Sequence, residues 1–270
     1  MKTTVTITDL TRMQGDRVCV AGYLPDNTCI RPVFETGGLT EQWLRIRGQA
    51  AIRPFAVIEL DVLRKVGQPL PPHTEDQIID ATHRAQRGAL TPEARWDWLT
   101  GVDDGGVGRI FGAPIRHEAG AYILAGEGTR SLGTIRVAQM DEVQFNPLEN
   151  GRRNYRLVFV DGENQRHRLP VTDLAFRTHL DYLHDQYGMP YAAIAQSLTR
   201  TLQQIPVILR IGLARGWERF PDRCYLQITG VYSSPDYLSG RCFADFAPPS
   251  VTAPRREGFF ARIARAFGGN

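Results

Sequence analysis

Short segments that alternate apolar and polar residues recur through most of this 270-residue chain, and they restrict its fold more than any other feature. Residues 4–7 read Thr-Val-Thr-Ile, and residues 56–63 place both of their acidic side chains on one face. A period of two residues is typical of a strand with one buried face. Segments 18–23 and 29–33 flank the sequence Leu-Pro-Asp-Asn, which predicts a hairpin. The first third of the chain is therefore predicted to form short strands.

The second half of the chain repeats this pattern. Segments 155–160 and 166–171 are predicted to pair across Asp161-Gly162, a dipeptide typical of tight hairpins. Further strands are predicted at residues 122–124, 132–137, 207–213 and 224–232.

Three helices are predicted between these strands. Thr91 suits the N-cap of the first helix and Pro92 its first position. Asp173 predicts the start of a second helix that ends near Tyr187, and a third follows Pro190. Many short strands with few helices favour a mainly β fold, a β-rich α+β chain of small barrels or sandwiches, over a parallel α/β sheet.

The composition fits a packed, soluble protein. Hydrophobic residues make up 42% of the chain, which excludes a disordered chain. No apolar stretch approaches the roughly 20 residues of a membrane span. The first ten residues lack the apolar segment of a signal peptide. We therefore expect a cytoplasmic protein.

The four cysteines, Cys19, Cys29, Cys224 and Cys242, form no C-x-x-C pair. The favoured interpretation is free thiols that are buried or half-buried. The alternative is a zinc site built from Cys224, Cys242 and a histidine. The chain has no phosphate-loop, G-x-S-x-G or kinase pattern. No catalytic residue, metal site or cofactor is predicted, and the protein is expected not to be an enzyme.

Several phrases of the sequence, taken in order, resemble a family of dual OB-domain proteins, which carry two OB-fold barrels. They are Val18-Cys19-Val20-Ala21-Gly22, Ile30-Arg31-Pro32-Val33, residues 71–76, Ser131-Leu132-Gly133-Thr134-Ile135, residues 209–215, residues 226–232 and Pro235-Asp236-Tyr237-Leu238. The resemblance covers about residues 3–246. It implies two barrels and nucleic-acid binding, because OB barrels commonly present a curved sheet face and loops to single strands.

This resemblance gives a domain plan. Residues 1–137 are expected to form an N-terminal OB-like barrel, and residues 138–246 a C-terminal OB-like barrel with a helical insertion. Residues 247–270 are expected to be a linker followed by a basic amphipathic tail helix. Four large apolar residues share one side of this helix and are predicted to dock onto a protein: Phe259, Phe260, Ile263 and Phe267. The partner is either another protein or this chain's own barrel, and an anionic membrane is a further alternative.

Arginine dominates the basic residues. The chain has 30 arginines and two lysines, yet its net charge is only +3, so any nucleic-acid surface must be a local patch. Guanidinium groups suit phosphates and base stacking, while a GC-rich genome would explain the same bias without function. The candidate nucleic-acid-binding residues are Arg31, Trp43, Arg45, Arg152, Arg153, Arg210, Arg215, Trp217, Arg219, Tyr232 and Tyr237. A solvated or ion-paired surface position is the alternative for each arginine, core packing for Trp43 and Trp217, and packing on its own barrel for the tyrosine-rich turn with Tyr232 and Tyr237.

Three functions remain open. The leading prediction is a non-enzymatic accessory module that binds single-stranded DNA or RNA within a larger complex, with a strong dependence on salt. The second is a protein adaptor that docks through the tail. The third is a metal-dependent hydrolase centred on Asp61, His73, Glu75 and Asp76, although a turn between the barrels is the favoured role for residues 73–76.

Overall fold

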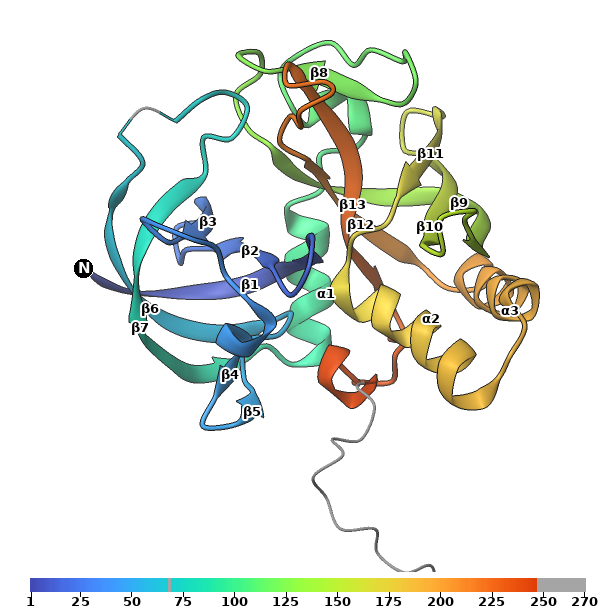
Figure 1. Ribbon diagram of the computed structural model, residues 1–270, viewed down its shortest axis with the longest axis horizontal. Helices are drawn as coiled ribbons and strands as arrows, with labels where there is room; N and C mark the ends of the chain where they lie inside the picture. Colours follow the sequence, from blue (N-terminus) through green and yellow to red (C-terminus); the bar gives the residue numbers. More distant parts are fainter. Residues whose placement is uncertain (68, 247–270) are drawn as a thin grey trace, which may run out of the picture.

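Two curved β-sheets, one closed and one half-open, make up most of the molecule (Figure 1). The computed structural model describes residues 1–67 and 69–246. The closed sheet lies on the left of Figure 1 and comes from the N-terminal part of the chain, and the half-open sheet lies on the right. A mainly β chain with two barrel-like units is therefore confirmed.

The first sheet is a barrel with strand order β1-β2-β3-β7-β6. Its long first strand is shared, because residues 6–12 of β1 pair with β2 and residues 2–6 pair with β6. β3 runs parallel to β7 and closes the barrel. The strands are β1 (Lys2–Arg12), β2 (Val18–Tyr23), β3 (Cys29–Val33), β6 (Ala56–Lys65) and β7 (Asp76–Ala89).

Alternation along these strands builds the core of the first barrel. Val5, Val20, Ile30 and Ile58 are fully buried inside it, as a period of two residues requires. Between β3 and β6, the 3-10 helix η1 (Glu41–Leu44) and the hairpin of β4 (Arg45–Ile46) and β5 (Gln49–Ala50) add the buried Leu44 to the same core.

The second sheet has the order β11-β10-β9-β12-β13-β8 and repeats the pairing scheme of the first. Residues 137–147 of β9 pair with β10, and residues 132–136 pair with β12. A parallel bridge between Val171 and Ile228 then curls the sheet without closing it. The strands are β8 (Tyr122–Leu124), β9 (Leu132–Pro147), β10 (Arg153–Asp161), β11 (Arg166–Pro170), β12 (Val207–Leu213) and β13 (Arg223–Ser233).

Two of the helices lie between the third and fourth strands of the second barrel. Asp173 caps α2 (Leu174–Tyr187) by accepting the Ala175 and Phe176 N–H groups at 2.8 and 3.1 Å. The helix ends at Gly188, whose positive φ of 63° suits glycine. α3 (Tyr191–Gln203) packs against β9 (Figure 1). The predicted helical insertion is therefore present.

The remaining helices lie in the segment between the two barrels and after the last strand. α1 (Pro92–Gly101) follows β7, and Thr91 Oγ1 accepts the Ala94 N–H at 3.3 Å, which confirms the predicted cap. The 3-10 helices η2 (Val107–Arg109) and η3 (Phe243–Phe246) lie in the connecting and final segments. Phe243 and Phe246 return to the core of the first barrel. No helix in residues 1–67 and 69–246 is long and apolar enough to cross a membrane.

Three expectations differ from the structure. β7 was not predicted, because its large apolar residues are confined to Ile78 and Ile79 near its start. Residues 73–76, expected to form a turn between the barrels, instead lead into β7 within the first barrel, with Asp76 as the first residue of that strand. The expected junction at residue 137 lies inside β9, whereas the chain leaves the first barrel after Ala89. The tail from residue 247 lies outside the described residues.

Candidate nucleic-acid interface

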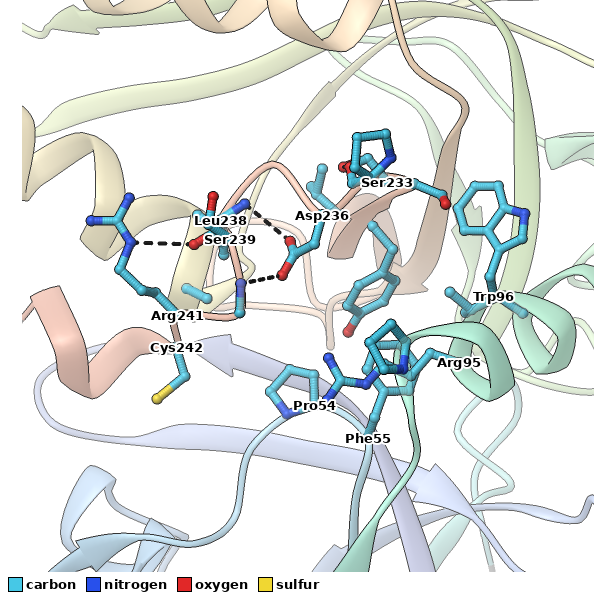
Figure 2. Close-up of a pocket in the computed structure, with 18 of the residues that line it drawn as sticks. Pro54, Phe55, Arg95, Trp96, Ser233, Asp236, Leu238, Ser239, Arg241 and Cys242 are labelled. Carbon is cyan, nitrogen blue, oxygen red and sulfur yellow. Dashed lines mark hydrogen bonds between the residues drawn. The ribbon is translucent and has the colours of Figure 1, made fainter.

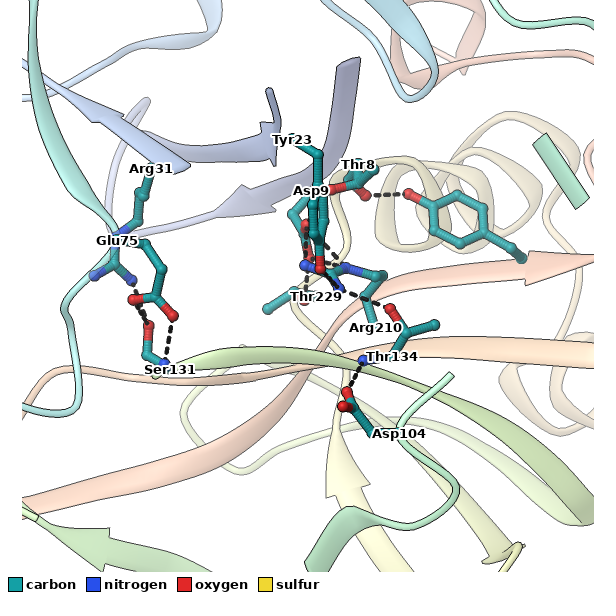
Figure 3. Close-up of polar contacts among 11 residues, drawn as sticks. Thr8, Asp9, Tyr23, Arg31, Glu75, Asp104, Ser131, Thr134, Arg210 and Thr229 are labelled. Carbon is teal, nitrogen blue, oxygen red and sulfur yellow. Dashed lines mark hydrogen bonds and ion pairs between the residues drawn. The ribbon is translucent and has the colours of Figure 1, made fainter. Parts of the chain in front are cut away.

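A buried polar network joins the two barrels, and Arg210 lies at its centre (Figure 3). Its guanidinium pairs with the Asp9 carboxylate, with Nη2 and Oδ2 3.0 Å apart, and donates to Tyr23 and Thr134 oxygens at 2.8 Å each. Burial alone would lower the pKa of Arg210, but the Asp9 carboxylate raises it well above its usual value. Thr229 also donates to Asp9, at 2.5 Å. Arg210 therefore has no exposed surface for an external phosphate.

A second buried cluster lies at the start of β7. Arg31 Nε pairs with Asp76 at 2.6 Å, and Glu75 accepts the backbone and hydroxyl hydrogens of Ser131 at 2.5 and 2.8 Å. Arg215 also pairs with Asp76. The Glu75–Ser131 contact is visible in Figure 3.

His73 belongs to the same cluster, where its Nε2 lies 3.2 Å from the Leu213 carbonyl oxygen. Burial and the nearby Arg31 and Arg215 lower its pKa to about 4. Asp61, the fourth residue of the hydrolase alternative, lies apart and pairs with the N-terminal amine at 2.7 Å. Within the described residues, no group of three or more histidine, cysteine, aspartate or glutamate residues is arranged to hold a metal.

These contacts cover the outer face of β2 and β3 in the first barrel. Arg31 and Tyr23 lie on that face and are buried. Tyr23 also packs edge-on against Trp98 of α1, with ring centroids 4.7 Å apart. Arg31 and Arg210, both proposed from the sequence as nucleic-acid contacts, are thus buried structural residues. The sequence did not indicate this, because their acidic partners lie far away along the chain.

The corresponding face of the second barrel is formed by β10 and β11 and remains open. Arg156 is half-buried there and Arg168 is exposed. Arg156 Nε donates to Asn154 at 3.1 Å, and Arg168 Nε donates to Gln144 at 2.9 Å. Neither arginine forms an ion pair with any residue that the structure describes. Burial lowers the pKa of Arg156, and the positive charge of Arg168 lowers it further.

The surroundings of this arginine pair are polar. Gln144 also donates to Glu142 at 2.7 Å, so the amide separates Arg168 from that carboxylate. Beside the arginine pair, a groove of about 710 Å³ runs between β9 and α3 and is lined by Arg168, Asn146 and Arg200 among others. Alternation in the hairpin 155–171 was the signal that could have revealed Arg156 and Arg168, because Leu157, Phe159 and Leu169 on the other face of the hairpin belong to the core.

Two loops of the second barrel hold other predicted residues. Arg152 is exposed in the turn between β9 and β10. Trp217, in the loop between β12 and β13, keeps 53% of its surface exposed and packs edge-on against Phe220 at 5.7 Å. The exposed Arg219 lies over the Phe220 ring, 5.3 Å from its centroid. Arg215, in the same loop, has 55% of its side chain exposed despite its pairing with Asp76.

The remaining predicted residues hold the fold together. Trp43 is buried and its indole N–H donates to the Ala81 carbonyl at 3.2 Å. Arg153 pairs with Asp181 and Asp185 of α2 at 2.7 and 2.5 Å. Arg45, Tyr232 and Tyr237 contact the Gly48 carbonyl, the Thr8 carbonyl and the Phe176 ring, respectively. The structure therefore does not bring the eleven predicted residues together on one surface.

All four cysteines are free. Cys224 and Cys242 are buried and Cys19 and Cys29 are half-buried, as the sequence predicted. Burial raises the pKa of the Cys29 thiol to about 12. The four docking residues Phe259, Phe260, Ile263 and Phe267 lie outside the described part of the chain.

Comparison with known proteins agrees with the repeated strand pattern. The model of a family described as dual OB-containing domain matches residues 4–231. No curated protein matches the chain.

Proposed function

Because the chain belongs to the dual OB-containing domain family, we propose that it is a nucleic-acid-binding module that holds single-stranded DNA or RNA on its second barrel. OB folds bind oligonucleotides through the face of their second and third strands and through the loops after the first and fourth strands. In the second barrel these elements are β10 with β11, the turn 148–152 and the loop 214–222.

The observation that carries this proposal is the pair Arg156 and Arg168. Two neighbouring guanidinium groups without a direct carboxylate partner in the described chain repel each other, and a bound phosphate would relieve that repulsion. Asn154 and Gln144 hold the two side chains in place without neutralising them. The pair therefore suits the backbone of a nucleic-acid strand.

The loops supply the other half of this proposed mechanism. Trp217 offers an exposed ring on which a base can stack, a contact worth about 1–3 kcal/mol. Arg152 and Arg219 are exposed and add positive charge at the two loops. The first barrel, whose equivalent face is covered, acts as a scaffold in this proposal. The module performs no chemistry of its own and works within a larger assembly.

Fluorescence polarisation with labelled single-stranded DNA and RNA tests the proposal. The double variant Arg156→Gln/Arg168→Gln is expected to weaken binding at least tenfold and to reduce the slope of log affinity against log salt by about 1–2. Trp217→Ala is expected to weaken binding by about 1–3 kcal/mol with a smaller change in salt slope.

The matched control is Arg64→Gln/Arg87→Gln, which removes the same charge from the first barrel. Arg64 and Arg87 pair with Glu35 and Glu59 at 2.5 and 2.8 Å. Equal losses of affinity in both double variants would show that only the net charge matters and would contradict a site at Arg156 and Arg168. Absence of binding at low salt would reject the proposal.

A further inference from the structure

A cavity of about 760 Å³ lies away from the proposed strand-binding face (Figure 2). Four segments distant in sequence line it: residues 53–55 before β6, the first two turns of α1, the start of α2 at Asp173 and Ala175, and residues 231–242 at the end of β13 and beyond. Segments of the first barrel, of the second barrel and of α1 therefore form the walls of the cavity. Its volume is within the range of small-molecule sites.

Aromatic side chains form much of the apolar lining. Phe55 and Tyr232 pack edge to face with ring centroids 4.8 Å apart, and Arg95 lies over the Phe55 ring at 5.4 Å. Trp96 of α1 is half-buried, lies next to Arg95 in Figure 2 and packs with the same cluster as Phe55. Flat aromatic rings in the lining favour a flat ligand.

The polar groups of the cavity include both donors and acceptors. Arg95 is held by the Leu90 carbonyl at 2.9 Å, and the side chain of Arg53 makes no hydrogen bond or ion pair within the described residues. The Asp236 carboxylate accepts the Leu238 and Gly240 N–H groups at 3.0 and 2.7 Å. Glu93 and Asp97 of α1 add further acceptors.

The backbone of Phe55 is the second observation that points to a ligand. Its φ of 65° lies in the left-handed region, which a bulky side chain rarely adopts. The surrounding structure holds it there: the Phe55 N–H donates to the Ile7 carbonyl at 2.6 Å, and its carbonyl accepts the Leu90 N–H at 2.9 Å. Such held residues concentrate at ligand sites, and this one places an aromatic ring in the cavity wall.

We infer that this cavity binds a nucleobase. A nucleobase is flat and aromatic, and its edge carries both hydrogen-bond donors and acceptors, which match the carboxylates and guanidinium groups of the lining. A purely apolar ligand would leave these charges unpaired, and a simple anion would meet carboxylates as well as arginines. The base comes either from a free nucleotide or from an unpaired strand, and only the second source rests on the proposed function.

Quenching of tryptophan fluorescence tests this inference. The probes are the four nucleoside 5′-monophosphates, ribose 5-phosphate as the phosphate without a base, and oligonucleotides with and without abasic positions. At least one base-containing probe is expected to quench saturably. Trp96→Phe is expected to lose the quenching by mononucleotides, and Trp217→Phe to retain it, because Trp217 does not line the cavity.

Affinity is checked with Arg53→Gln, which removes a side chain that is unbonded within the described chain and so preserves folding. This variant is expected to raise the Kd of the quenching probe at least fivefold, whereas Arg64→Gln, outside the cavity, is expected to leave it unchanged. Quenching by mononucleotides identifies a free nucleotide as the source, and quenching by intact but not abasic strands identifies a strand.

Absence of quenching by every base-containing probe would overturn the inference, as would equal quenching by ribose 5-phosphate. The two proposals fail separately. Loss of strand binding in the Arg156→Gln/Arg168→Gln variant concerns the second barrel, and the Trp96 signal concerns the cavity.

Discussion

At the scale of single residues, charged side chains in this protein serve two different purposes. Arg210 and Arg31 are buried and paired with Asp9 and Asp76, so they join the barrels. Arg156 and Arg168 have amide partners and lie on an open face. Arginines paired with a buried carboxylate thus stabilise the fold, whereas arginines bonded only to amides on an open face are candidate binding groups.

Arg210→Met is expected to lower the free energy of unfolding by about 3–5 kcal/mol, because it leaves the Asp9 carboxylate buried without its cation. Urea unfolding followed by circular dichroism measures the loss. Arg87→Met, which breaks an exposed pair with Glu59, should cost far less, because water already screens that pair. Similar losses in the two variants would contradict a structural role for Arg210.

His73 makes stability depend on pH. Its pKa falls from 6.5 to about 4 on folding, so between these values the unfolded chain binds a proton that the native state does not. Its contribution to stability is therefore present above pH 6.5 and is lost as the pH falls toward 4, by about 3 kcal/mol in full. His73→Gln keeps a donor for the Leu213 carbonyl but does not titrate. Urea unfolding from pH 7.5 to 4.5 should show wild-type protein losing stability relative to the variant, and parallel curves would disprove this.

At the scale of elements, the features that depend on neighbouring residues, such as helix caps and hairpins, were predicted correctly from the sequence. The cap at Thr91, the cap at Asp173 and the pairing of β10 with β11 all follow from residues close in sequence. β7 was missed because only the start of its 14 residues is strongly apolar. The candidate site could be predicted only in part, because Asp9 and Arg210 are 201 residues apart and a strand pattern does not say which barrel a face will meet.

Two glycines at helix ends should respond to alanine with opposite signs. Gly188 ends α2 at a φ of 63° with open space around its Cβ position, so Gly188→Ala is expected to destabilise by about 1 kcal/mol through backbone strain alone. Gly101 lies within α1, also in open space, and Gly101→Ala is expected to stabilise by about 0.4–1 kcal/mol. Thermal unfolding of both variants measures the difference, and a shared sign would refute it.

At the scale of the whole molecule, the two barrels share their cores as well as their polar network. Leu174 and Ala175 of α2 pack with the first barrel, while Phe176 and Leu180 of the same helix pack with the second. The segment at Phe243 returns to the first barrel after the last strand of the second. Neither barrel is complete without residues from the other half of the chain.

Residues 1–246 are therefore expected to unfold in one transition. Calorimetric and van't Hoff enthalpies should agree, and circular dichroism and tryptophan fluorescence should report the same midpoint. Trp43 reports on the first barrel and Trp217 on the second. Two separated midpoints would show that the barrels are independent units.

The covered face of the first barrel has a consequence for stoichiometry. Of the two barrels that the structure describes, the second alone keeps the face of its second and third strands open, so under the proposed function each chain would offer one track to a nucleic-acid strand. A saturated complex would then hold one strand per chain, with a footprint of about 4–16 nucleotides, as for a single OB fold. A longer oligonucleotide would recruit additional copies of the protein instead of wrapping onto the other barrel.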